Sequence, residues 1–281
     1  MAEDFDLEIL RGRLHAHQFG KLPEVPVFCV PGLSSNSRVF DALGEFRQEH
    51  GAGIVAFDLR GRGWSEIGPP GTYGWEHHAQ DLFEAADAMN VEHFDLIGHS
   101  MGAFVSMTAV SIDRDRRIRR VVLIDGLGIP TQTSITAILA GLARLKGTFP
   151  TRDAYVEAVR SAGLATPWNR YWEAHYRYDL IDTDDGVRPR TDLAAVTEDA
   201  AYGGTHDVRA LWPLMTVPTL VLRATVPIGG PDGFIVSRED YDAFLRDVPN
   251  ARGEEIAANH FSVAVDPKSL EAMHAFIESG S

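Results

Sequence analysis

A serine lies in a sequence context that suits nucleophilic chemistry: the segment GHSMG spans residues 98–102, with Ser100 at its centre. Residues 94–97 are typical of a buried strand, and residues 103–109 are typical of an apolar helix. At such a turn the serine hydroxyl projects away from the sheet, and the next N–H points to where an oxyanion would form. Glycine is needed on both sides because a Cβ would collide with the neighbouring elements. The pattern predicts that Ser100 is a nucleophile, and an idle serine in a glycine-rich turn is the alternative.

Strands and helices are expected to alternate along most of the chain. Residues 5–18 alternate in hydropathy and predict an antiparallel hairpin at a sheet edge. Further strands are predicted at 25–30, 53–57, 94–97, 121–124, 218–223 and 253–257. Helices are predicted at 40–50, 75–89, 241–248 and 267–277. This order predicts an α/β fold with a mostly parallel, doubly wound sheet of about eight strands, whose ligand site lies beyond the carboxyl ends of the strands.

The alternation stops in the middle of the chain, where no clear buried strand is expected. Helical patterns occur there at 134–146, 152–161 and 168–178, and a polar stretch that contains glycine follows at 182–204. We therefore expect a core domain formed by residues 1–128 and 215–281. A helical cap would be inserted at residues 129–214.

The composition limits the partners and the compartment of the protein. The formal net charge of −14 argues against nucleic acid or an anionic membrane surface as a partner. No apolar run approaches the roughly 18 residues of a membrane-spanning helix, and the acidic N-terminus does not resemble a secretory signal. The single cysteine, Cys29, lies in an apolar run and is expected in the core of a protein from a reducing compartment. We therefore expect a cytoplasmic protein that acts on a small molecule, and no heptad pattern indicates its oligomeric state.

Four segments together resemble the α/β-hydrolase superfamily, and the resemblance covers nearly all of the chain outside the expected cap. They are VPGL at 30–33, DLRGRG at 58–63, GHSMG at 98–102 and NHF at 259–261. The resemblance implies a serine hydrolase whose nucleophile, acid and histidine follow in that order along the chain. Haloalkane dehalogenases and epoxide hydrolases of this superfamily carry an aspartate at the nucleophile position, so their reactions are not expected here.

One departure from the superfamily pattern lies in the first loop. Many relatives carry a histidine directly before the glycine of that loop, where this chain has Pro31. The position shapes the oxyanion loop and performs no chemistry. The departure therefore implies a modified pocket in an active enzyme.

The resemblance implies a catalytic histidine late in the chain, because a serine alone is a poor nucleophile at neutral pH. His260 follows the expected last strand and resembles that histidine, with a buried or capping histidine as the alternative. Structural, surface or lid-contact roles are expected for His77, His78, His99 and His274.

The sequence leaves two places for the acid that would orient His260. In most relatives the acid follows the strand after the cap at a short offset, but here Asp232 is reached only through an enlarged loop. In a minority of relatives it stands at the end of the strand before the cap, which is Asp125 in this chain. We favour Asp125 and keep Asp232 as the alternative. Glu239 and Asp240 stand at a predicted helix start, where acidic residues usually serve the helix dipole.

By the superfamily pattern, the backbone N–H groups of Leu33 and Met101 form the oxyanion hole. Ser34 beside them is expected to be a plain turn serine, with a hydroxyl donor to the oxyanion as the alternative. Hydrolysis would proceed through an acyl-serine that water then releases. No metal or organic cofactor is implied, because no Cys/His cluster has zinc spacing and no phosphate-binding loop follows residues 61–63.

An aromatic and basic cluster in the expected cap would suit a small aromatic or carboxylate-bearing acyl compound, with an arginine pairing the carboxylate. We predict that the substrate is contacted by Trp168, Arg170, Tyr171 and Trp172. The alternative is that these aromatics hold a short helix on the core. The expected activity is hydrolysis of a small-molecule carboxylic ester, with a lactone, an amide or a C–C bond as alternatives. A ligand-binding or receptor protein on the same fold is the alternative from another class.

Overall fold

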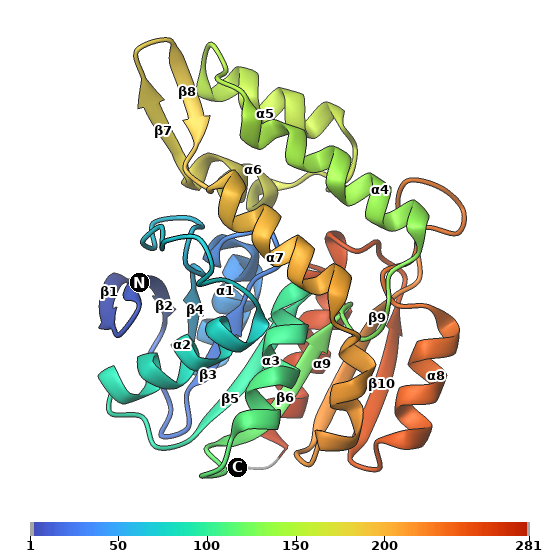
Figure 1. The fold of residues 1–281 in the computed structure, drawn as a ribbon. Helices are drawn as coiled ribbons and strands as arrows, with labels where there is room; N and C mark the ends of the chain where they lie inside the picture. The colour runs from blue at the N-terminus through green and yellow to red at the C-terminus, as the bar shows by residue number, and fades with distance from the viewer. Residues whose placement is uncertain (1–2, 280–281) are drawn as a thin grey trace.

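The computed structural model describes residues 3–279, and within them eight strands form one sheet (Figure 1). Their order is β1-β2-β4-β3-β5-β6-β9-β10, with an antiparallel hairpin at one edge and parallel pairing from β4 to β10. The strands are β1 Glu3–Ile9, β2 Gly12–Phe19, β3 Val27–Val30, β4 Ile54–Phe57, β5 Phe94–His99, β6 Ile118–Ile124, β9 Thr219–Ala224 and β10 Ala251–Ile256. The predicted α/β fold with a mostly parallel sheet is confirmed.

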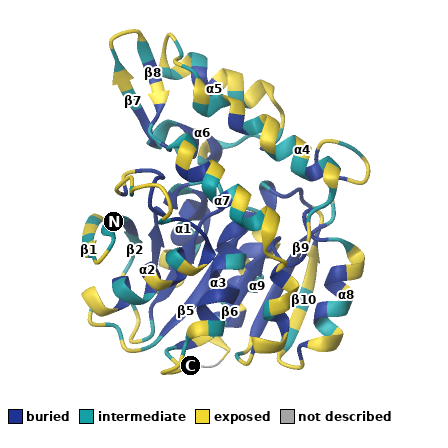
Figure 2. Ribbon diagram, viewed as in Figure 1, coloured by how far each residue is buried: buried dark blue, intermediate teal, exposed yellow. Residues whose placement is uncertain are grey.

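The central strands are apolar on both faces, as parallel strands between two layers of helices require. Every residue of β3, β4, β5 and β9 is buried, so the sheet is the dark interior of the molecule in Figure 2. The register sets Val30 of β3 beside Gly98 of β5, and Ile124 of β6 beside His99. The carboxyl ends of these three strands therefore meet at one edge, and the residues that follow each strand lie close together there.

Helices cover both faces of this sheet. They are α1 Asp41–Glu49, α2 Trp75–Ala88, α3 Met101–Ile112, α8 Arg238–Asp247 and α9 Pro267–Glu278, with short 3₁₀ turns η1 Ser37–Phe40 and η4 Ser262–Ala264. Apolar residues of α2, α3 and α8 share one core cluster with one face of the sheet. Those of α1 and α9 share a second cluster with the other face. Cys29 is buried in this second cluster.

The middle of the chain forms a layer above the carboxyl edge of the sheet (Figure 1). Its elements are α4 Gln132–Gly141, η2 Leu142–Lys146, α5 Arg152–Ser161, α6 Arg170–Tyr178, β7 Leu180–Thr183, β8 Gly186–Pro189, α7 Leu193–Thr205 and η3 Val208–Leu214. Residues 182–204 form most of the β7–β8 hairpin and of α7, where only a polar stretch that contains glycine was predicted. Each hairpin strand has four residues, too few for the alternation of apolar and polar side chains to be recognised.

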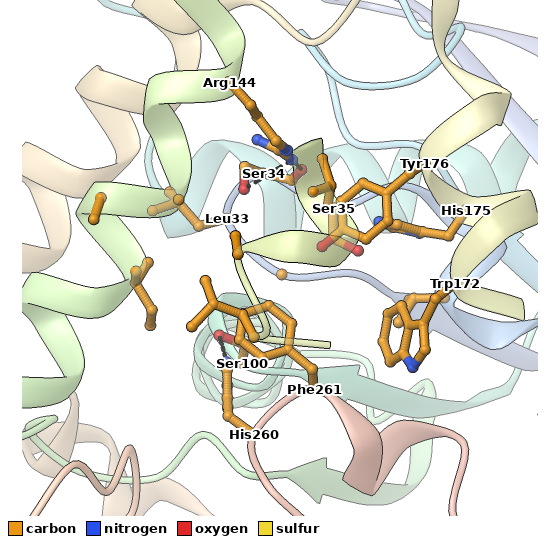
Figure 3. A pocket seen from close by; sticks show the side chains of 18 of the residues that line it. Leu33, Ser34, Ser35, Ser100, Arg144, Trp172, His175, Tyr176, His260 and Phe261 are labelled. Carbon is orange, nitrogen blue, oxygen red and sulfur yellow. Dashed lines mark hydrogen bonds between the residues drawn. The ribbon is translucent and has the colours of Figure 1, made fainter. Parts of the chain in front are cut away.

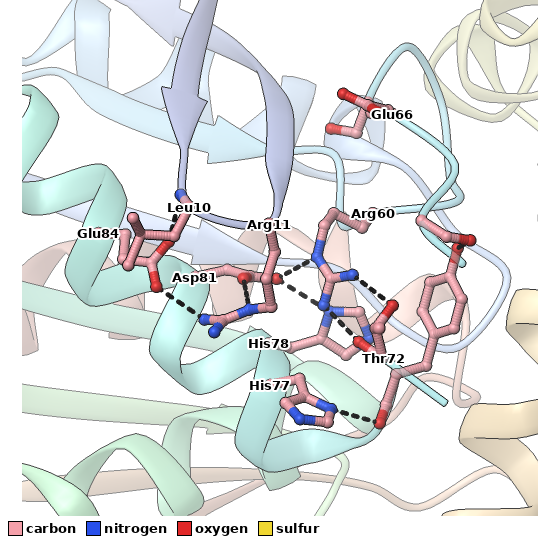
Figure 4. Close-up of polar contacts among 12 residues, drawn as sticks. Leu10, Arg11, Arg60, Glu66, Thr72, His77, His78, Asp81 and Glu84 are labelled. Atoms are coloured by element: carbon pink, nitrogen blue, oxygen red, sulfur yellow. Dashed lines mark hydrogen bonds and ion pairs between the residues drawn. The ribbon is translucent and has the colours of Figure 1, made fainter. Parts of the chain in front are cut away.

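An ion-pair cluster holds the loop after β4 against α2 (Figure 4). Asp81 of α2 accepts hydrogen bonds from Arg60 Nε at 2.7 Å and from Arg11 Nε at 2.8 Å. Arg60 also donates to the carbonyl of Thr72, and Arg11 to Glu84. These contacts tie the edge hairpin, the loop after β4 and α2 together below the carboxyl edge of the sheet. Among residues 3–279, no helix is both long and apolar enough to cross a membrane.

Candidate active site

Ser100 stands at the sharp turn between β5 and α3. Its backbone adopts φ 57° and ψ −121°, a region that side chains rarely occupy, and its N–H donates to the carbonyl of Ile124 at 2.9 Å. A Cβ on Gly98 would lie 2.2 Å from the carbonyl oxygen of Gly102, and a Cβ on Gly102 would lie 2.0 Å from that of Val30. Both glycines are therefore required by the close approach of strand and helix.

His260 reaches Ser100 from the loop after β10. Its Nε2 lies 3.0 Å from the hydroxyl oxygen of Ser100, and its Nδ1 lies 2.8 Å from Oδ2 of Asp125. Because a carboxylate only accepts, Nδ1–H donates to Asp125 and Nε2 is free to accept the serine proton. The loop is held by Asn259, whose Oδ1 accepts hydrogen bonds from the backbone N–H groups of Phe261 and Ser262.

The structure brings Asp125, and not the other acidic candidates, to His260. Asp125 follows β6, is 1% exposed, and accepts the N–H of Ala224 through Oδ1 at 3.0 Å. Asp232 is exposed and accepts a hydrogen bond from the hydroxyl of Thr133. The two other acidic candidates also lie away from His260. Glu239 is exposed. The Asp240 carboxylate accepts the N–H of Ile129, and the Asp240 N–H donates to the hydroxyl of Ser237.

The loop after β3 lies against the nucleophile. A Cβ on Gly32 would stand 3.1 Å from the Cβ of Ser100. The backbone N–H groups of Leu33 and Met101 have no hydrogen-bond partner among the described residues, as oxyanion donors require. The carbonyl of Leu33 accepts from Arg62 through Nε at 3.0 Å and Nη2 at 2.9 Å, which fixes the orientation of this loop. The sequence analysis assigned no role to Arg62, although it lies within the DLRGRG segment.

His99 packs beneath His260. The two rings stack with centroids 4.9 Å apart, and Nε2–H of His99 donates to the carbonyl of His260 at 2.8 Å. Burial, and then the proximity of His260, lower the pKa of His99 to about 3, so its ring is neutral at neutral pH. His99 therefore holds the loop of His260 without adding a charge.

A cavity of about 390 Å³ extends from Ser100 and His260 into the layer above (Figure 3), a size that suits a small molecule. Of the four cap residues predicted to contact substrate, Trp172 lies in its described wall and the other three do not. Arg170 is 70% exposed and pairs with Glu45, which also accepts the hydroxyl of Tyr171 at 2.8 Å. Trp168 stacks on Tyr176, with ring centroids 5.9 Å apart.

The helical period of α6 explains why Arg170 and Tyr171 lie outside the cavity wall. Positions three and four apart share one face of a helix. Trp172, His175 and Tyr176 lie on the face that lines the cavity, while Arg170 and Tyr171 contact Glu45 outside it. The arginine in the cavity wall is Arg144 of η2. It was not predicted, because nothing local distinguishes it from the other basic residues in the middle of the chain.

A second cavity of about 730 Å³ adjoins the first. Ser100 and Leu33 border both cavities, and the second runs between α3, α4 and α7. Its wall is mainly apolar, with small residues of α7 leaving space beside Phe104 of α3. In the part of the chain that the structure describes, no group of three or more His, Cys, Asp and Glu side chains is arranged to hold a metal ion.

The chain is similar to known proteins along most of its length. The 2-(acetamidomethylene)succinate hydrolase of Mesorhizobium japonicum is 27% identical over 289 residues, which cover 97% of this chain and 94% of that protein. The 2-hydroxymuconate semialdehyde hydrolase of Pseudomonas putida is 23% identical over 227 residues, or 75% and 80% of the two chains. A crystal structure of E-2-(acetamidomethylene)succinate hydrolase shares the fold, with a TM-score of 0.86 at 24% identity over 99% of this chain and 100% of the other. Since the family described as alpha/beta hydrolase fold also matches residues 25–262, the chain belongs to that family.

Proposed function

We propose that the protein is a serine hydrolase that cleaves a small-molecule acyl compound through an acyl-serine. The observation that carries this proposal is the chain of hydrogen bonds from Ser100 to His260 and on to Asp125, with distances of 3.0 and 2.8 Å. A serine that is hydrogen-bonded in this way becomes a nucleophile as its proton passes to the imidazole, and the buried carboxylate stabilises the imidazolium that forms.

In the first half of the reaction, the hydroxyl oxygen of Ser100 attacks the acyl carbon and its proton moves to Nε2 of His260. The carbonyl oxygen becomes an oxyanion, which the N–H groups of Leu33 and Met101 stabilise. Removing one such donor costs roughly 3–4 kcal/mol in a studied serine protease. The tetrahedral intermediate collapses, the bond to the leaving group breaks, and the proton on Nε2 goes to that group.

In the second half, a water molecule gives a proton to Nε2 of His260 and attacks the acyl-serine. The second oxyanion uses the same two N–H groups. The bond to Ser100 then breaks, the proton returns to its oxygen, and the acid leaves. No side chain beyond these residues has to move a proton.

We propose a carboxylic ester as the scissile group, and an amide is the second candidate. The amide is favoured by the similarity to the Mesorhizobium japonicum hydrolase, whose name contains an acetamido group and whose alignment spans 97% of this chain. The same serine chemistry serves both bonds, because the proton on Nε2 can pass to an alkoxide or to an amine. The substrate is a small molecule in either case.

Replacement of Ser100 by alanine tests the function directly. The purified protein is incubated with p-nitrophenyl acetate and, separately, with a fluorophosphonate probe. We expect turnover and covalent labelling in the wild type and neither in Ser100→Ala, because the hydroxyl that forms the acyl bond is gone. Circular dichroism of the variant controls for loss of fold.

Intact labelling or turnover in Ser100→Ala would refute the assignment of the nucleophile. A wild type that neither turns over the ester nor reacts with the probe would instead favour a ligand-binding protein on this fold. The bond type is then read by comparing a matched ester and amide of the same acid under identical conditions.

A further inference from the structure

The cavity beside Ser100 carries a positive charge at the end away from the serine. Among its described lining residues, Arg144 is the only one with a Lys or Arg side chain, and none of these residues is an Asp or a Glu. Figure 3 shows Arg144 and Ser34 toward one end of the cavity and Ser100 and His260 toward the other. A substrate that fills the cavity from the nucleophile outward would therefore reach the guanidinium.

The guanidinium of Arg144 has unused hydrogen-bonding capacity. Its Nη2 donates to the carbonyl oxygen of Ser34 at 2.8 Å and lies 3.4 Å from the hydroxyl oxygen of Ser34, while Nη1 has no hydrogen-bond partner among the described residues. The ring of Tyr176 lies 5.7 Å from the guanidinium carbon. The negative charge of Asp179 acts on Arg144 at longer range, but its Oδ2 accepts the N–H and the hydroxyl of Thr191. A cation drawn out of water without a close counter-ion is costly, so an anionic ligand here gains a strong interaction.

The imidazole beside Arg144 adds a neutral donor. His175 is 3% exposed, lines the same cavity, and has an Nδ1 atom without a hydrogen-bond partner among the described residues. Burial, and then the charge of Arg144, lower the pKa of His175 to about 3. The ring is therefore neutral at neutral pH. It can donate an N–H to an anion without repelling the guanidinium.

The second cavity has the opposite character. Its described wall contains Asp199 and Asp207 and no Lys or Arg, and most of it is apolar. With a net charge of −14, the molecule as a whole does not attract anions at long range. An anionic group that enters the site therefore meets a guanidinium in the described wall of the first cavity and no Lys or Arg in that of the second.

We propose that Arg144 binds a carboxylate of the substrate, so that the preferred substrates are small acyl compounds that carry a free carboxylate. This inference rests on the proposed hydrolase function. It gives to Arg144 the carboxylate-pairing role that was expected from the sequence for an arginine of the aromatic and basic cluster. A guanidinium suits this task because its planar set of donors matches the two oxygens of a carboxylate.

Two pairs of esters test the proposal, each with and without the carboxylate. Monomethyl and dimethyl succinate carry it on the acyl side, and 4-acetoxybenzoate and its methyl ester carry it on the leaving group. We expect the wild type to prefer the anionic member of at least one pair. In Arg144→Gln, kcat/KM for that anionic ester should fall about 10- to 100-fold, mainly through KM, because a charge-assisted hydrogen bond is lost. The matched neutral ester should change less than about 3-fold.

Two further variants separate charge from geometry. Arg144→Lys keeps a cation without the planar donor set, and we expect it to retain part of the preference for the anionic ester. Arg188→Gln removes an exposed arginine from the cap hairpin and should leave both esters unchanged. All rates are followed by titration of the acid released at constant pH.

Failure of this proposal and failure of the hydrolase function give different results. If Arg144→Gln lowers kcat equally for neutral and anionic esters, the residue only holds the loop of Ser34, and the proposal is overturned. It is also overturned if the wild type hydrolyses all four esters without preference. If no ester is hydrolysed and the fluorophosphonate probe does not label Ser100, the proposed hydrolase function itself has failed.

Discussion

Asp125 binds His260 through one carboxylate oxygen and the backbone of β9 through the other. Oδ2 accepts Nδ1–H of His260 at 2.8 Å, and Oδ1 accepts the N–H of Ala224 at 3.0 Å. Its backbone adopts φ 44°, an uncommon value for a residue other than glycine. The local conformation and two hydrogen bonds together fix the carboxylate. This arrangement sets the tautomer of His260 and thereby leaves Nε2 as the proton acceptor for Ser100.

Replacement of the acid at position 125 should therefore abolish most of the activity. Asp125→Asn keeps the shape of the side chain but allows the amide to donate to the ring, which favours the wrong tautomer. We expect kcat for p-nitrophenyl acetate to fall about 10⁴-fold. Asp232→Asn is the matched control, and its exposed position predicts a kcat within about 2-fold of wild type. A large loss in Asp232→Asn with little loss in Asp125→Asn would reverse the assignment.

At the scale of elements, α7 is coupled to the loop after β3 through a buried ion pair. Asp199 of α7 pairs with Arg62 at 2.6 Å and with His78 of α2 at 3.0 Å, and all three side chains are fully buried. Arg62 in turn donates to the carbonyl of Leu33. Burial of Asp199 raises its pKa, but the charges of His78 and Arg62 outweigh burial, and the pKa lies well below its usual value. A helix above the sheet thus fixes a loop beside the nucleophile.

Breaking this connection should affect stability and catalysis together. Asp199→Asn leaves Arg62 buried without its counter-ion, so we expect the free energy of unfolding to fall by about 3–5 kcal/mol. Urea unfolding at neutral pH measures this loss. The neighbouring Glu198→Gln is the control, because Glu198 accepts one backbone N–H through each carboxylate oxygen and the single oxygen of glutamine keeps one of these two bonds, so a smaller loss is expected. If the free energy of unfolding of Asp199→Asn equals that of the wild type, the coupling is contradicted.

The coupling also has a pH dependence. Because the pKa of Asp199 is lower in the folded protein than in the unfolded chain, its contribution to stability is fully present above the unfolded value of 3.8. The contribution is lost as the pH falls through the folded pKa. The destabilising effect of Asp199→Asn should therefore be largest at neutral pH and shrink in strong acid.

For the molecule as a whole, buried carboxyl groups away from the site make stability depend on pH in the opposite sense. Asp41 at the start of α1 accepts from Arg38 Nε at 2.9 Å, while its Oδ1 has no partner among the described residues. Burial raises its pKa to about 7, against the opposing charge of Arg38. Burial likewise raises the pKa of Asp95 to about 6. A raised folded pKa contributes stability below the unfolded value of 3.8, and this contribution is lost as the pH rises through 7.

Replacement of Asp41 by a neutral residue should therefore increase the stability of the folded protein most in mild base. We expect the change in Tm caused by Asp41→Asn to be more favourable at pH 8 than at pH 5, because the wild-type carboxyl must ionise in its buried site at the higher pH. Thermal unfolding followed by circular dichroism at both pH values measures the difference. Glu49→Gln on the exposed side of the same helix is the control. An equal change in Tm at the two pH values would contradict the raised pKa.

Local sequence patterns were sufficient for the sheet and the elbow. Burial on both faces demands continuous apolar runs, so the strands can be read from consecutive residues. The glycines around Ser100 follow from a backbone approach that tolerates no Cβ. The resemblance added the order of nucleophile, acid and histidine, which placed His260 in the last loop before the terminal helix.

The choice between Asp125 and Asp232 depended on the tertiary structure, and so did the place of Arg144, which the sequence did not indicate, in the cavity wall. The two aspartates are the same residue type, as are the two arginines, and their distance from the site in space cannot be read from their positions in the sequence. Which acid reaches His260 follows from the parallel pairing of β6 with β5 and β9. Arg170 lies outside the cavity because of the face that α6 turns toward the core, and Arg144 lines the cavity because of the place of η2. Contacts between residues far apart in sequence carry this information, because burial and ion pairing are decided only when separate elements pack against each other.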